Sequence, residues 1–143
     1  MKQPKNNTLE IAAPESDYLY VASSLIPDSG MGLFTCINIF KDEVICLFGG
    51  EIIGEERAKE RIFLNLDQYF ISLPNGKYLD SFQSTCFARY ANDAKGKYIG
   101  SAKNNAKIAL NDQEKVCLIA TKKIKAGSEI YCTYGKSYWL KHG

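Results

Sequence analysis

The sequence has little of what identifies several common classes of protein. It holds one histidine, His142, and its five cysteines include no pair spaced as Cys-x-x-Cys or Cys-x-Cys. These absences, with the odd cysteine count, argue against a zinc site and against a disulfide framework. No apolar run approaches the roughly 18 residues that span a bilayer, and the polar segment 1–16 lacks a signal core. We therefore predict reduced thiols, an intracellular, reducing compartment, no metal and no membrane partner.

The net charge is small as well. A formal charge of +2 at pH 7 does not indicate a nucleic-acid binder. The charges are nevertheless unevenly placed, because residues 1–83 hold 7 Lys or Arg and 12 Asp or Glu, whereas residues 84–143 hold 11 and 4. The acidic half could attract a basic peptide; the alternative is that folding mixes both halves over one surface.

The length and composition suit one domain with a real core. The chain has 143 residues, of which 45% are hydrophobic. We predict a flexible leader over residues 1–16 and a single domain over residues 17–143.

Short apolar runs, each bounded by Gly, Asp, Asn or Lys, dominate the rest of the chain and predict strands. These runs are residues 19–23, 33–37, 44–48, 69–73, 116–120 and 130–134. The best helix is Glu55–Phe63, which is rich in Glu, Arg, Lys and Ala, and Thr85–Ala91 predicts a short helical turn. Because no regular helices separate the strands, we expect a mainly β fold and not a doubly wound parallel sheet.

Two segments contain residue types that suit ligand binding. Gly30 and Gly32 flank Met31 after a Pro-Asp turn, and such a pair lets the backbone approach a ligand and reach positive φ. A Gly-x-Gly turn between two strands is more often only a hairpin. Farther on, Asn92 interrupts an apolar stretch and offers a donor and an acceptor to a polar group. The alternative is a capped turn formed with Asp93.

Two further segments lie near the C-terminus. Residues 124–135 form a turn and a strand that ends in Tyr134, and a tyrosine at a strand end can aim its hydroxyl into a cleft. The alternative is a core tyrosine whose hydroxyl is bonded internally. Tyr138 and Trp139 follow, and adjacent aromatics can close over a planar ligand. The alternative is packing that pins the terminus to the body.

In order and spacing these segments resemble the SET-domain family. The shared pattern is Gly-x-Gly near the start, Arg-aromatic-x-Asn from Arg89 to Asn92, and Gly-x-Glu-Ile-x-x-x-Tyr-Gly near the end. Shorter family-like elements lie at residues 41–45, 78–81 and 105–106. The likeness runs from Tyr18 to Leu140, which is nearly the whole chain.

The resemblance implies a β-clip SET fold, in which several small curved sheets surround a pseudoknot-like crossing with a few short helices. The crossing would place residues 89–94 beside residues 129–135. Threading of this kind is rare among folds. Cofactor and substrate would enter from opposite faces and meet in a narrow channel.

The resemblance also implies a protein-lysine methyltransferase that uses S-adenosylmethionine as its cofactor and needs no metal. Tyr134 and Tyr69 would be its catalytic residues, and Tyr131 and Cys132 would line the substrate channel. The small side chain of Cys132 favours di- or trimethylation. The expected cofactor-binding residues are Gly30, Met31, Gly32, Tyr69, Arg89, Tyr90, Asn92, Asp93, Tyr134 and Trp139. The expected partner is a protein that bears a target lysine, a histone or another protein, and nucleic acid is not expected as the substrate.

Two departures from the family pattern leave other functions open. Asp93 stands where the family has histidine, and residues 95–104 intervene before the family's Pro-Asn element. Asp93 favours the runner-up, a non-catalytic SET-like module that binds peptide or cofactor without turnover. A third alternative is a small β-domain for RNA, which would need exposed aromatic and basic residues interleaved on one sheet. A nuclear setting is left open, and the oligomeric state is not predicted.

Overall fold

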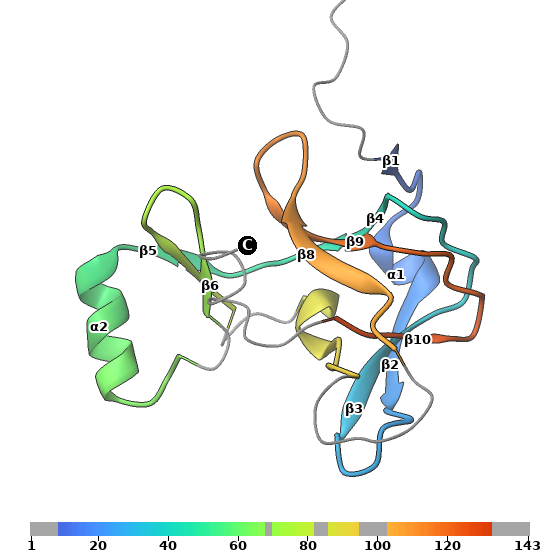
Figure 1. Cartoon of the computed structure of the whole chain (residues 1–143), viewed down its shortest axis with the longest axis horizontal. Helices are drawn as coiled ribbons and strands as arrows, with labels where there is room; N and C mark the ends of the chain where they lie inside the picture. The colour runs from blue at the N-terminus through green and yellow to red at the C-terminus, as the bar shows by residue number, and fades with distance from the viewer. Residues whose placement is uncertain (1–8, 68–69, 82–85, 95–102, 133–143) are drawn as a thin grey trace, which may run out of the picture.

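A computed structural model of the chain describes residues 9–67, 70–81, 86–94 and 103–132 (Figure 1). Within these ranges the chain forms three small β-sheets, two α-helices and one 3-10 helix. This arrangement confirms the predicted mainly β fold. None of the helices in the described part of the chain is long and apolar enough to cross a membrane.

The largest sheet has four strands in the order β1-β4-β9-β8. Its strands are β1 (Leu9–Glu10), β4 (Glu43–Leu47), β9 (Val116–Ala120) and β8 (Ala106–Leu110). The pairs are antiparallel except for β1 with β4. Every residue of β9 is buried, because alternate residues of this continuous apolar strand face two different apolar clusters.

A second sheet, in the order β10-β3-β2, carries the paired glycines. Its strands are β10 (Glu129–Ile130), β3 (Met31–Thr35) and β2 (Leu19–Ser23), and the short helix α1 (Glu15–Tyr18) leads into β2. Strands β2 and β3 form a hairpin in which Ser23 lies opposite Met31. Because β10 pairs with the other side of β3, the hairpin is held by a strand from the far end of the described chain.

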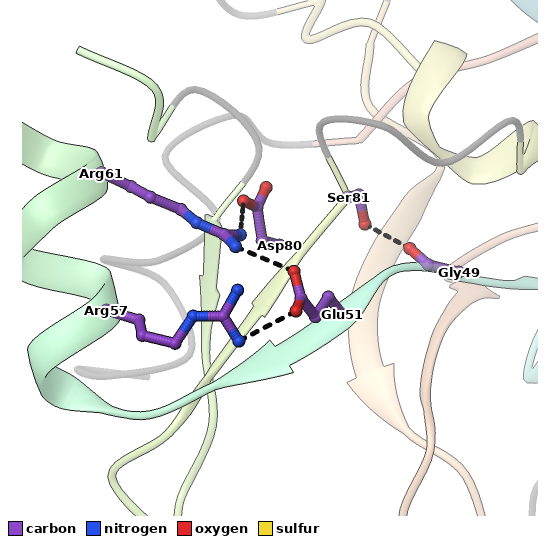
Figure 2. A network of polar contacts seen from close by, with 6 residues as sticks. All are labelled: Gly49, Glu51, Arg57, Arg61, Asp80 and Ser81. Atoms are coloured by element: carbon purple, nitrogen blue, oxygen red, sulfur yellow. Dashed lines mark hydrogen bonds and ion pairs between the residues drawn. The ribbon is translucent and has the colours of Figure 1, made fainter. Parts of the chain in front are cut away.

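The third sheet lies with a helix at one end of the molecule's long axis (Figure 1). Its strands, in the order β5-β7-β6, are β5 (Glu51–Ile53), β7 (Tyr78–Asp80) and β6 (Phe70–Ser72), and the helix is α2 (Glu55–Phe63). Two arginines of α2 reach acidic residues of this sheet (Figure 2). Arg57 pairs with Glu51 at 2.9 Å, and Arg61 pairs with Glu51 at 2.9 Å and with Asp80 at 2.5 Å.

One apolar core joins the three sheets. Five of its side chains, each 0% exposed, come from five strands: Leu33, Ile45, Ile71, Leu118 and Ile130. The 3-10 helix η1 (Phe87–Tyr90) contacts β2, β3 and β4 and adds Ala88 to the same cluster. Burying each large aliphatic side chain contributes about 1.5–3 kcal/mol. The core therefore fixes the places where η1, β3 and β10 meet, which is where the candidate site lies.

The sequence predicted β2, β9 and α2 with their observed bounds. The strands expected at 33–37 and 44–48 begin earlier, at Met31 and Glu43. The strand expected over residues 130–134 is observed as β10, but it begins one residue earlier and ends at Ile130, and Tyr131 forms only an isolated bridge. The chain leaves β3 at that point to pair with Asn92. Four elements, β1, β5, β8 and α1, were not predicted.

Residues 9–18 contact the body of the domain. Leu9 and Glu10 pair in parallel with Glu43 and Val44, and the carboxylate of Glu15 accepts a hydrogen bond from the Leu47 backbone N–H at 2.9 Å. The predicted boundary between a leader over residues 1–16 and a domain over residues 17–143 stays a prediction. Residues 1–8 lie outside the described residues.

We expect the stability of the core to fall at alkaline pH. Burial raises the pKa of the Cys117 thiol to about 11, and burial also raises the pKa of Cys46 and of the Tyr18 hydroxyl, which donates to the Ile45 carbonyl at 2.6 Å. The unfolded chain ionises its thiols near pH 9.0, so this stabilisation is fully present below that pH and is lost as pH rises through 11. Urea unfolding at pH 8, 9, 10 and 11 measures the fall.

A Cys117→Ala variant serves as the control for this prediction, because it lacks one of the buried thiols. Its free energy of unfolding should fall less between pH 9 and pH 11 than that of the wild-type protein. Equal falls in the two proteins would contradict the assignment to Cys117.

Candidate functional site

Of the paired glycines, Gly30 ends the loop between β2 and β3, and Gly32 lies within β3. Gly30 has φ +67, a left-handed conformation that glycine adopts without strain. Its carbonyl accepts a hydrogen bond from the Ser24 N–H at 2.8 Å, which closes the loop. A Cβ added to Gly30 would meet nothing within 4 Å, and the adjacent Met31 is 48% exposed. This side of the turn is therefore open to a ligand that contacts the backbone.

Gly32 serves a different need. A Cβ at this position would clash with the carboxylate of Glu129 and would lie 3.2 Å from the Cβ of Ser24. Gly32 lies inside β3 and is buried. Only glycine lets the Glu129 side chain lie against the β3 backbone here.

The carboxylate of Glu129 is the centre of a hydrogen-bonded cluster and is almost fully buried, at 2% exposed. Its Oε2 accepts from the Ser24 hydroxyl at 2.6 Å and from the Asn92 amide nitrogen at 3.4 Å. Its Oε1 accepts from the Leu25 N–H at 2.8 Å and from the Tyr131 hydroxyl at 3.0 Å. One side chain thus links the β2–β3 loop, the segment after η1 and the segment after β10.

Asn92 makes the crossing between the middle and the end of the chain. Its amide nitrogen donates to the Met31 carbonyl at 3.0 Å, and its own carbonyl accepts from the Cys132 N–H at 2.8 Å. Asn92 and Tyr131 also form a parallel bridge. The expected juxtaposition of residues 89–94 with the segment that follows Glu129 is therefore observed as far as Cys132.

Two asparagines before β8 brace this crossing. The Asn105 amide oxygen accepts from the Tyr131 N–H at 2.9 Å, and its amide nitrogen donates to the Glu129 carbonyl at 3.1 Å. Asn104 donates to the Asp93 carboxylate at 3.1 Å and accepts from the Ala94 N–H at 2.8 Å. The Asp93 carboxylate therefore helps to join the two ends of the segment between residues 94 and 104.

The remaining predicted site residues occupy two kinds of position. Arg89 and Tyr90 are half-buried on η1, with the guanidinium carbon of Arg89 6.0 Å from the Tyr90 ring centre. Tyr131 is 7% exposed and packs against Ile26 and Ala94, while Cys132 is 0% exposed in the main core. The channel role of the last two stays a prediction.

The structure brings Gly30, Met31, Gly32, Asn92 and Tyr131 into one connected cluster. The three aromatic residues Tyr69, Tyr134 and Trp139 lie outside the described residues, so their roles remain predictions. Within the described ranges, no group of three or more His, Cys, Asp or Glu residues is arranged to hold a metal ion.

Sequence reasoning missed Glu129 and Asn105 as members of the site. Both residues lie in segments that resemble the family, Glu129 in the Gly-x-Glu-Ile motif and Asn105 at residues 105–106, but no role was predicted for either. The available signal was a carboxylate beside Ile130 in a strand of apolar and aromatic residues. A charged group in such a setting is buried only when it has partners.

Comparison with known proteins decides the family. The SET-domain family model matches residues 30–135, which is most of the chain and includes Gly30, Gly32, Asn92, Glu129 and Tyr131. The chain belongs to the SET-domain family. The predicted family is therefore confirmed. No curated protein sequence was found to match the chain.

Solved structures with the same fold include Polycomb Repressive Complex 2 proteins. A humanized mutant of the Chaetomium thermophilum Polycomb Repressive Complex 2 bound to an inhibitor matches with a TM-score of 0.67 and 22% identity, over 83% of this chain. ctPRC2 in an autoinhibited conformation bound to S-adenosylmethionine matches with a TM-score of 0.67 and 23% identity, over 84%. This SET domain spans 15% of the length of each of those chains. The likeness shows the SET fold.

Proposed function

We propose that this SET domain transfers methyl groups from S-adenosylmethionine to a lysine side-chain amine of a protein substrate. The observation that carries the proposal is the pair of hydrogen bonds by which Asn92 joins the Met31 carbonyl to the Cys132 N–H. These bonds connect the open glycine turn to the segment that runs on to Tyr134. The family match and the S-adenosylmethionine bound to one similar protein support the proposal.

The residues around the turn fit this cofactor, which would supply a methyl group on a positively charged sulfur: as the amine nitrogen bonds to the methyl carbon, the carbon–sulfur bond would break and leave its electron pair on the sulfur. We assign the backbone of residues 30–32 to the cofactor's methionine portion, because a Cβ at Gly30 would enter open space. Asn92 fixes the turn, since its amide nitrogen is directed at the Met31 carbonyl. The remaining contacts are assigned to Arg89, Tyr90, Asp93, Tyr69 and Trp139, with Tyr134 at the reacting end.

The protein's part in the reaction is to supply an uncharged amine and to hold it in line. A lysine amine in water is protonated, and apolar aromatic surroundings favour its neutral form. We assign these surroundings to Tyr69, Cys132 and Tyr131. Because the Tyr131 hydroxyl donates to Glu129, we assign only the ring of Tyr131 to the channel. The lysine ammonium releases a proton to solvent before the reaction, and the hydroxyl of Tyr134 orients the resulting neutral amine. Positioning of this kind supplies most of the rate.

A binding and transfer assay tests the proposal. The chain is titrated with S-adenosylmethionine, and then labelled methyl transfer is measured with histones and with proteins of a whole-cell extract. We expect saturable binding and label on lysine, with mass spectrometry showing di- or trimethylation because Cys132 is small. Failure of the chain to bind S-adenosylmethionine would refute the proposed function.

We expect Tyr134→Phe to bind S-adenosylmethionine as the wild-type protein does and to transfer methyl groups about tenfold more slowly, or slower still, because the orienting hydroxyl is lost. Tyr20→Phe is the matched control, since Tyr20 is 40% exposed on β2 and stacks on Phe34 with ring centres 5.4 Å apart. Equal transfer rates in the two variants would remove Tyr134 from the mechanism.

The second candidate is a SET-like module that binds cofactor or peptide without turnover. The observation that favours it is Asp93, whose carboxylate accepts from Asn104 where the family pattern has a histidine. Binding of S-adenosylmethionine without label transfer to any protein would favour this module. For both candidate functions we propose a protein partner and an intracellular, reducing compartment, which includes the nucleus.

A further inference from the structure

Glu129 lies beside the proposed cofactor turn, and the proposed reaction gives it no chemical step. We propose that Glu129 is a positioning residue, whose buried carboxylate holds the β2–β3 loop, Asn92 and Tyr131 in the arrangement that S-adenosylmethionine binding requires. This inference rests on the proposed function and deepens it. It concerns how the cofactor site is built, and the carboxylate itself takes no part in methyl transfer.

The geometry gives each carboxylate oxygen one donor from the loop and one from elsewhere. Oε2 accepts from Ser24 and Asn92, and Oε1 accepts from Leu25 and Tyr131. Ser24 and Leu25 open the loop that the Gly30 carbonyl closes. The Asn92 amide nitrogen, which donates to Glu129, also donates a hydrogen bond to the Met31 carbonyl at 3.0 Å. The carboxylate is thus hydrogen-bonded directly to the start of the proposed cofactor turn, at Ser24 and Leu25, and through Asn92 to its end, at Met31.

The position of the carboxylate is itself fixed from three sides. The Glu129 carbonyl accepts from the Asn105 amide nitrogen at 3.1 Å, and Glu129 lies opposite Phe34 in the pairing of β10 with β3. Gly32 lets the side chain lie flat against β3. With the backbone held in this way, a change of side-chain chemistry at position 129 alters the turn and leaves the strand pairing in place.

The four donors require a group that only accepts. A glutamine would place its NH₂ either toward the Leu25 N–H, which cannot accept, or toward the Asn92 amide nitrogen. Asn92 could accept only by turning its amide, which would break its bond to the Met31 carbonyl. The hydroxyls of Ser24 and Tyr131 can rotate and accept, but they do not remove the conflict. Either orientation of glutamine therefore breaks a link to one end of the turn.

The test compares Glu129→Gln with the wild-type protein. We expect the Kd and KM for S-adenosylmethionine to rise about tenfold, because a buried hydrogen bond to a charged acceptor is lost. The KM for a lysine peptide should change less than twofold, and the folded state should persist at the assay temperature. Glu43→Gln is the matched control: Glu43 accepts the Phe40 N–H at 2.7 Å on the surface, and a glutamine oxygen can replace it there.

A second variant covers the case in which Glu129→Gln does not fold. Ser24→Ala keeps the carboxylate and removes one donor, and we expect the Kd for S-adenosylmethionine to rise about threefold with the peptide KM unchanged. The inference is overturned if a folded Glu129→Gln protein binds the cofactor as tightly as the wild type. Equal rises in both KM values would overturn it too, as would an unchanged Kd in Ser24→Ala where Glu129→Gln does not fold. A wild-type protein that binds no S-adenosylmethionine refutes the proposed function itself, and the inference with it.

Discussion

Replacing Gly32 with alanine should lower the free energy of unfolding by about 3 kcal/mol, because it overpacks the site and breaks buried hydrogen bonds. It should also raise the Kd for S-adenosylmethionine by about 100-fold. The added Cβ would clash with the Glu129 carboxylate. A surface glutamate would swing away, but this carboxylate is 2% exposed and accepts from Ser24 at 2.6 Å. Moving it breaks the links to the β2–β3 loop and to Asn92. Thermal unfolding and a cofactor titration measure the two effects.

Gly76→Ala is a control in which a glycine is replaced by alanine where the added Cβ causes no clash. Gly76 has φ +85 in the turn between β6 and β7, and a Cβ there meets nothing within 4 Å. The left-handed conformation costs alanine about 1 kcal/mol, so this control should lose some stability and no cofactor affinity. If Gly32→Ala behaves like Gly76→Ala, the close approach of Glu129 to β3 is not what holds the site.

Replacing Arg61 with methionine should lower the free energy of unfolding by about 2 kcal/mol, because it takes the cationic partner from a buried carboxylate. Arg61 joins Asp80, which is 6% exposed, at 2.5 Å, and it also joins Glu51 at 2.9 Å (Figure 2). Hydrogen bonds to these two carboxylates raise the pKa of Arg61, and the bond from Arg61 lowers the pKa of Glu51. Urea unfolding at neutral pH measures the loss.

Arg57→Met is the matched control, because it changes the same residue type on the same helix. Arg57 also pairs with Glu51 at 2.9 Å, but both side chains are more than half exposed. Exposed pairs of this kind contribute little, so we expect no measurable loss of stability. Similar losses in the two variants would show that the burial of Asp80 does not decide the effect.

The sequence predicted best the elements in which pattern and burial agree. β9 is a continuous apolar run and is buried throughout, and α2 has a helix-forming composition. β8 was not predicted because Ala106–Leu110 contains two alanines and Lys107, residue types that are depleted in strands, and is flanked by asparagines. β5 has only three residues, and its pairing with β7 identifies it as a strand.

The site was predicted as far as motif order allows. The resemblance to the SET-domain family, which rests on motif order, implied that residues 89–94 lie beside residues 129–135, and the structure has this crossing at Asn92 and Tyr131. The cluster around Glu129 could not be predicted, since it depends on Ser24, more than a hundred positions earlier in the chain. A glutamate next to Ile130 in a strand also fits a solvent-facing residue. Only the pairing of β10 with β3 turns it inward against Gly32.

The long separations within this cluster have a consequence for protein synthesis. Ser24, Leu25 and Asn92 leave the ribosome well before Glu129, their common acceptor, which follows them by 105, 104 and 37 positions. Contacts between residues so far apart form slowly, because a long stretch of chain must be closed. A nascent chain that stops short of β10 holds three of the four donors, Ser24, Leu25 and Asn92, and lacks their acceptor. The proposed S-adenosylmethionine site is therefore completed only when β10 docks.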